Sequence, residues 1–109
     1  MATNYKVLGQ VAPLATTATA IYTVPSATQT VVSSITVCNR SATDGTFRLA
    51  VRPDGATLAN EHYVVYDTSV SGNDTVVLVM GLTLDAGDVL EVYASSADMS
   101  FNVYGSEIS

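Results

Sequence analysis

The chain has 109 residues, of which 48% are hydrophobic and only 13% are charged. This length allows one domain with one modest core, and the charged share is about half of the ~25% that is usual in globular domains. The net charge of −6 argues against nucleic acid and against anionic membrane surfaces as partners, because both attract basic proteins. Serine and threonine take the place of the missing charges. Such a composition suits strands and also interfaces between subunits, which are depleted in charge.

No apolar run approaches the roughly 18 residues of a membrane span. Residues 1–6 lack the basic region and apolar core of a signal peptide. We therefore expect the protein to be made in the cytoplasm.

Short segments rich in valine, isoleucine and threonine recur along the chain and predict β-strands. The first twenty residues are expected to be partly extended, with an edge strand over residues 3–11 and a loop over residues 12–20 that contains Pro13. The later strands are expected over residues 20–24, 28–39, 47–52, 61–67, 75–84 with a bend at Gly81, 89–94 and 99–104.

Two of these segments predict how their faces are used. Phe47, Leu49 and Val51 alternate with Arg48, Ala50 and Arg52, so this strand is expected to have one wet face. Residues 76–80 are apolar at every position. That pattern predicts cover on both sides, by the core and by a neighbouring subunit.

The turns and the longest strand give further expectations. In residues 31–38, odd-numbered and even-numbered residues are expected on opposite faces. Residues 39–45 end in Asp-Gly and predict a hairpin loop, and Pro-Asp-Gly at 53–55 predicts a second turn. Residues 56–60 are expected to form one helical turn, and residues 85–88 a tight acidic turn.

No window of helical length carries a 3.6-residue apolar period. Seven or eight short strands with regular turn signals predict an all-β fold, a single-domain antiparallel β-sandwich or small barrel over residues 1–109. A jelly-roll-like and an immunoglobulin-like sandwich both remain open.

Two residues invite a catalytic interpretation. Cys38, the only cysteine, has no disulfide partner within the chain and is expected to be a buried, small apolar side chain. His62, the only histidine, follows Glu61, but no Gly-x-Ser-x-Gly motif accompanies it. A lone histidine in a strand is more often a hydrogen-bonded or surface residue, so we expect no enzyme here and no catalytic residue.

Aspartates and tyrosines are the remaining candidates for a binding site. The aspartates stand at turns, where their side chains bond nearby backbone N–H groups, and no EF-hand spacing is present. We therefore expect no metal-binding or cofactor-binding residue, the best alternative being a cation at Asp85 and Asp88 joined by Asp67, Asp74 or Asp98. The six tyrosines are expected to pack their rings and wet their hydroxyls. The alternative is a tyrosine-rich face that binds sugar or a protein, formed from Tyr5, Tyr22, Tyr63, Tyr66, Tyr93 and Tyr104.

Four blocks of residues, taken in order, resemble small virion proteins of tailed bacteriophages that are described as structural, tail or fibre proteins. The blocks are Leu8-Gly9-Gln10-Val11-Ala12-Pro13; Ile21-Tyr22-Thr23-Val24-Pro25 leading into residues 31–39; Phe47-Arg48-Leu49-Ala50-Val51 with Asp54-Gly55; and residues 82–94 followed by Ser100-Phe101 and Gly105. The blocks follow strands and turns, so the resemblance implies a scaffold and no active site.

The resemblance implies a virion protein assembled in the host cytoplasm. We expect a capsid decoration (cement) protein that bridges major capsid proteins; the alternative is a tail, baseplate or fibre component, acting as an adaptor or as a host-surface glycan-binding module. The low charge and the two-sided apolar strand favour a homo-oligomer, with a trimer as our expectation. Contacts are expected in residues 1–20, 40–45, 53–60 and 67–74.

Overall fold

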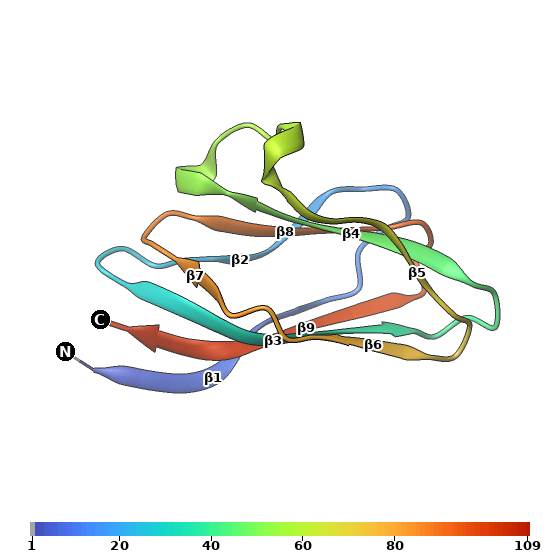
Figure 1. Ribbon diagram of the computed structural model, residues 1–109, viewed down its shortest axis with the longest axis horizontal. Coiled ribbons are helices and arrows are strands. Elements are labelled where there is room, and N and C mark those ends of the chain that lie inside the picture. The colour runs from blue at the N-terminus through green and yellow to red at the C-terminus, as the bar shows by residue number, and fades with distance from the viewer. Residues whose placement is uncertain (1) are drawn as a thin grey trace.

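The computed structural model describes residues 2–109, which form two antiparallel sheets packed face to face (Figure 1). Nine strands and two short 3₁₀ turns follow one another along the chain. They are β1 (Thr3–Val11), β2 (Thr19–Thr23), β3 (Gln29–Asn39), β4 (Gly45–Arg52), η1 (Pro53–Gly55), η2 (Asn60–His62), β5 (Tyr63–Val70), β6 (Thr75–Leu78), β7 (Leu82–Leu84), β8 (Val89–Ala94) and β9 (Met99–Ile108). The predicted all-β sandwich is confirmed.

The strand order is that of a jelly roll. The first sheet has the order β1-β9-β3-β6, with β7 also paired to β3, and the second sheet has the order β2-β8-β4-β5. Strands from the two ends of the chain pair in nested fashion: β1 with β9, β2 with β8, β3 with β6 and β7, and β4 with β5. A long antiparallel hairpin wound into two sheets has this pattern, whereas an immunoglobulin sandwich pairs its first two strands with each other.

The ninth strand comes from a break in the segment expected over residues 75–84. Gly81 has a φ of +58°, a conformation that interrupts a strand and that glycine adopts without steric cost. The segment therefore divides into β6 and β7, which pair with different parts of β3.

The hairpin loop predicted over residues 39–45 is wrong. Strands β3 and β4 lie in different sheets, so this segment crosses from one sheet to the other. Its turn is organised by Asn39, which is buried: the side-chain amide donates to the carbonyl oxygens of Thr43 (2.9 Å) and Val70 (3.2 Å). An Asp-Gly pair marks a turn but does not specify whether the flanking strands pair.

The helical turn predicted over residues 56–60 is also displaced. One 3₁₀ turn precedes this segment at Pro53–Gly55 and another overlaps its end at Asn60–His62, with irregular backbone between them. Proline at the start of the first turn fixes the backbone angle that the turn needs, and Ala59 is extended at φ −137°. The pattern of small residues alone did not reveal these boundaries.

A β-bulge corrects the faces expected for β3. The register with β9 shifts between Val32 and Ser34, so the alternation restarts after Ser33. Val32, Ile35 and Val37 are buried and face the core, although the sequence placed Val32 on the face opposite the other two.

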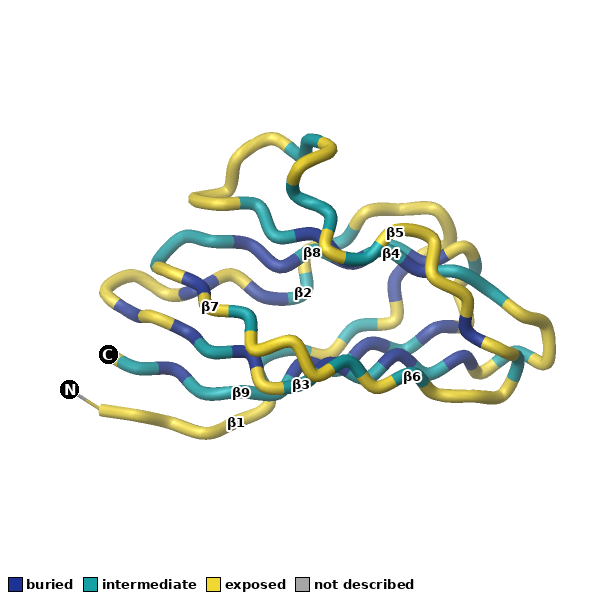
Figure 2. The backbone as a smooth tube through the Cα atoms, in the orientation of Figure 1, coloured by how far each residue is buried: buried dark blue, intermediate teal, exposed yellow. Residues whose placement is uncertain are grey.

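The core lies between the two sheets, where Figure 2 shows the buried positions. Phe47 of β4 and Phe101 of β9 meet there edge to face, with ring centroids 6.1 Å apart. The predicted core cover of residues 76–80 is present, because Val76 and Leu78 pack against the core. Val77 and Val79 are 59% and 82% exposed in the single chain. Among the described residues, no helix is long and apolar enough to cross a membrane.

Candidate functional site

The outer face of the first sheet consists of uncharged residues. The pairing register aligns outward side chains in rows across the sheet, for example Tyr5–Ser106–Val31–Thr83 and Gln10–Asn102–Thr36–Val77. Only β1, at one edge, and β6 and β7, at the other, lack a second neighbour in this sheet. The outward residues are Thr3, Tyr5, Val7, Gln10, Gln29, Val31, Ser34, Thr36, Cys38, Thr75, Val77, Thr83, Ser100, Asn102, Tyr104, Ser106 and Ile108.

All fourteen charged residues, four basic and ten acidic, lie elsewhere. Lys6 and Glu107 belong to strands of the first sheet but lie on its opposite side, where their side chains pair with each other at 2.8 Å; the Lys6 side chain stays 49% exposed. The second sheet carries Arg48, Arg52, Asp67 and Glu91, and the connections carry Arg40, Asp44, Asp54, Glu61, Asp74, Asp85, Asp88 and Asp98. The strands of this face therefore present no charged side chain outward. Charged residues border the face at its ends, where Asp85 and Asp88 lie beside Thr83 and Arg40 bonds to Asp98.

Apolar side chains are exposed at both edges of this face. Tyr5 is 85% exposed and Val7 47% exposed on β1, and Val77 and Val79 are at the opposite edge. Figure 2 shows the exposed backbone along β1 and around the β6–β7 connection. Exposed apolar side chains gathered on an uncharged face are typical of a protein–protein contact.

Behind this face, a polar network ties four strands together at one end of the sandwich. The hydroxyl of Tyr22 on β2 donates to Glu107 Oε2 on β9 (2.5 Å) and shares a hydrogen bond with Thr30 Oγ1 on β3 (2.7 Å). The Lys6 ammonium on β1 and the Tyr22 hydroxyl lower the pKa of the Glu107 carboxyl. Burial, followed by the hydrogen bond to Glu107, raises the pKa of Tyr22 to about 12.

The second sheet presents a different surface, centred on Arg48. Its guanidinium lies between the rings of Tyr66 and Tyr93, 4.2 and 4.3 Å from their centroids, and Nε donates to Asp67 Oδ1 at 2.7 Å. The ring of Tyr63 meets that of Tyr66 edge to face at 4.9 Å. The hydrogen bond between Arg48 and Asp67 lowers the pKa of the Asp67 carboxyl and raises that of the guanidinium.

Irregular pairing of β4 with β5 brings this cluster together. The register shifts between Phe47 and Leu49, and Asp67 has a φ of +51°, which aspartate tolerates better than most residues. The sequence did not reveal the cluster because its members come from three strands. The alternation around Arg48 was the only signal, and it correctly predicted a wet face.

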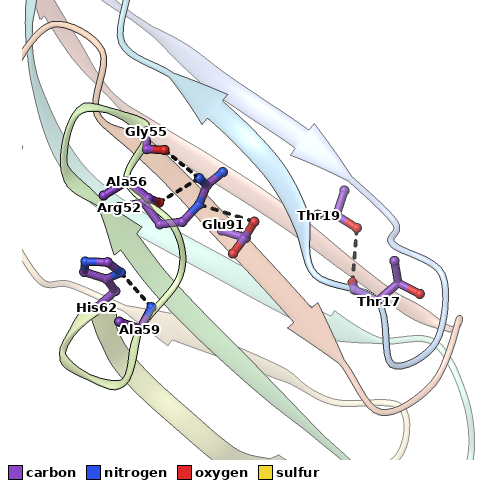
Figure 3. A network of polar contacts seen from close by, with 8 residues as sticks. All are labelled: Thr17, Thr19, Arg52, Gly55, Ala56, Ala59, His62 and Glu91. Carbon is purple, nitrogen blue, oxygen red and sulfur yellow. Dashed lines mark hydrogen bonds and ion pairs between the residues drawn. The ribbon is translucent and has the colours of Figure 1, made fainter.

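The connection of residues 53–62 is fixed to the second sheet by polar contacts (Figure 3). A terminal guanidinium nitrogen of Arg52 donates to the carbonyl oxygens of Gly55 and Ala56, and its Nε lies 3.5 Å from Glu91 Oε1. His62, drawn in the same view, accepts a hydrogen bond at Nδ1 from the Ala59 backbone N–H (3.0 Å). The Nδ1 atom of His62 therefore forms a hydrogen bond within the turn to which His62 belongs.

The prediction that Cys38 is buried is wrong. It is half-buried rather than buried, because it lies on the outward side of β3, opposite the buried side chains of Val37 and Asn39.

The aspartates at the 85–88 turn act as turn residues. Asp88 accepts the backbone N–H groups of Asp54 and Asp85, and Asp85 accepts that of Ala86. Elsewhere, Asp74 accepts the N–H of Thr75, while Asp67 pairs with Arg48. Within residues 2–109, no three histidine, cysteine, aspartate or glutamate side chains gather in a group that could hold a metal ion.

No family model matches this chain, and no curated protein is significantly similar to it.

Proposed function

We propose that this chain is a structural protein of a tailed-bacteriophage virion, a decoration protein that bridges and stabilises major capsid proteins. The observation that carries the proposal is the uncharged outer face of the first sheet, which suits burial between copies of the chain in an assembly. Jelly rolls recur in viral capsid domains, which supports the proposal by analogy, although a fold by itself does not define a function. The order of the four blocks that resemble phage virion proteins points the same way.

The proposed role needs shape and surface rather than catalytic chemistry. A bridging protein stabilises a shell by removing apolar surface from water and by adding hydrogen bonds across the contact. The proposed partners are further copies of the chain and capsid or other virion proteins, not nucleic acid or a membrane. We expect the protein to assemble in the host cytoplasm and to reside in the virion. The segments 1–20, 40–45, 53–60 and 67–74 remain the predicted contacts with other virion proteins.

Copy number per particle tests this role. Quantitative mass spectrometry of purified virions should give a copy number comparable to that of the major capsid protein. A handful of copies would move the protein to the tail, baseplate or a vertex, and its absence from virions would overturn the proposal.

The Arg48 cluster favours a second candidate function, a tail, baseplate or fibre adaptor or host-surface binding module. Tyr66 is 57% exposed and its ring stacks on a guanidinium, beside a carboxylate. Aromatic rings with neighbouring polar groups suit the apolar faces and hydroxyls of sugars. A glycan array probed with the folded protein should then give hits that Tyr66→Ala abolishes and Tyr5→Ala retains; an array without hits would exclude the glycan-binding version.

A further inference from the structure

We propose that two copies of this chain associate face to face through the outer face of the first sheet. This deepens the self-association part of the proposed function by naming the surface and the number of copies. The inference itself rests on the geometry of the sheet and holds whether the protein sits on a capsid or a tail.

The charge distribution identifies a second copy as the occupant. In a twofold contact the same surface meets itself, so a charged side chain near the axis faces its own copy and is repelled. A face adapted to a different, charged partner would instead carry complementary charges. Here a chain of net charge −6 keeps charged side chains off the outward positions of four paired strands, with charged residues bordering the face only at its ends, which is an arrangement that permits contact between two acidic copies.

The size of the face fits a stable dimer. Four strands spaced ~4.8 Å apart make a sheet ~19 Å wide, and ten residues at ~3.4 Å each make it ~34 Å long. The flat footprint is therefore about 650 Å² per copy, close to the ~800 Å² per partner of a standard protein interface. In a twofold contact this face meets the same face of one partner, so the contact joins two copies.

The apolar edges of the face strengthen the fit. Tyr5 and Val7 are exposed at one edge, Val77 and Val79 at the other. A twofold axis along the strands places the β1 edge of one copy over the β6 edge of its partner, and an axis across the strands places like edges together. Either arrangement removes exposed apolar side chains at both edges from water, around a centre of hydroxyl and amide groups such as Thr36 and Asn102.

Sedimentation equilibrium of the full chain over a range of concentrations tests the inference. We expect the wild type to be a dimer. Val77→Lys should raise the dimer dissociation constant at least about tenfold, because a buried interface charge is costly. The substitution also reduces the magnitude of the net charge by one, so weaker association cannot come from greater overall repulsion. Tyr5→Lys, at the opposite edge and 85% exposed, should have the same effect.

Val64→Lys is the matched control. It makes the same chemical change at a valine that is 42% exposed on β5 of the second sheet, and it should leave the dissociation constant unchanged. A monomeric wild type, a trimer, or a Val77→Lys variant that dimerises as tightly as the wild type would overturn the inference. Sedimentation of the purified protein tests the dimer, and mass spectrometry of purified virions tests the virion role. A protein that dimerises but is absent from virions would contradict the virion role and leave the dimer standing.

Discussion

At the scale of single residues, Glu107 shows how a nearly buried carboxylate remains charged. Its two oxygens are bound by different partners, the Lys6 ammonium and the Tyr22 hydroxyl, and these partners stabilise the ionised form more than burial opposes it. The three residues come from β1, β2 and β9, so one charge holds together strands from both sheets.

Tyr22→Phe removes the hydroxyl from this network and leaves the carboxylate with one partner fewer. We expect a loss of about 1–3 kcal/mol in the free energy of unfolding, the usual cost of leaving a buried polar group unsatisfied. Urea denaturation measures it. Tyr66→Phe, the same change on the exposed surface, should stay within about 0.5 kcal/mol of the wild type; an equal loss in both variants would contradict the assignment.

The lowered pKa of Glu107 gives stability a defined pH dependence. A carboxyl whose pKa is lower in the folded than in the unfolded chain stabilises the fold fully when the pH is above its ordinary pKa of 4.5. This contribution is lost as the pH falls through the lowered pKa. The free energy of unfolding should therefore differ most between wild type and Glu107→Gln near neutral pH. The difference should shrink as pH falls below 4.5, and a gap independent of pH would refute the role of ionisation.

At the scale of elements, periodicity predicted the strands well because alternating burial leaves a direct trace in the sequence. Residues 89–94 and 99–104 were located correctly, and β9 extends a few residues further. The bulge at Ser33 and the sheet-to-sheet connection over 39–45 were not predictable, since both depend on partners distant in the chain.

The interaction surfaces could be predicted only in part, for the same reason. The sequence indicated a charge-poor surface and identified Asp74, Asp85 and Asp88 as turn residues, whereas Asp67 lies within β5. It did not reveal that the outward positions of the first sheet carry no charged residue. This pattern depends on the pairing register, which brings residues such as Tyr5, Val31 and Val77 onto the same face.

Gly72 illustrates how the connections constrain one another. A Cβ at this position would lie 2.2 Å from the Ala42 carbonyl oxygen, where the connection after β5 passes the connection after β3. Because the clash is with backbone, Gly72→Ala should lower the free energy of unfolding by more than about 2 kcal/mol. Gly55→Ala, in open space but at φ +69°, should cost only about 1 kcal/mol of backbone strain. Thermal unfolding compares the two, and equal losses would argue against close packing of the connections.

At the scale of the whole molecule, the two sheets share one hydrophobic core, which contains an aromatic contact between them. Phe47 and Phe101 are fully buried and come from opposite sheets. Phe47→Ala should leave a cavity and cost about 3–5 kcal/mol, measured by denaturant unfolding. Leu14→Ala, at a residue 72% exposed, should change stability little. A small loss for Phe47→Ala would mean that the sheets close over the gap.

The proposed dimer also has a characteristic salt dependence. Each copy carries a net charge of −6, but the proposed contact is uncharged, so added salt screens repulsion between copies without weakening any interfacial ion pair. The dissociation constant should therefore fall modestly between about 50 mM and 500 mM salt. Sedimentation equilibrium at each salt concentration measures the dissociation constant. A marked rise of this constant with salt would indicate an interface built on ion pairs.

The two ends of the described chain lie side by side on β1 and β9 (Figure 1), where Ala2 and Ser109 exchange two backbone hydrogen bonds. These strands are antiparallel, so a mechanical force pulling the ends apart loads the hydrogen bonds one pair at a time and peels β1 away like a zipper. A force across the sheet face instead loads the whole stack of side chains together. The molecule should thus resist compression and shear through its faces far better than tension applied to the ends of β1 and β9.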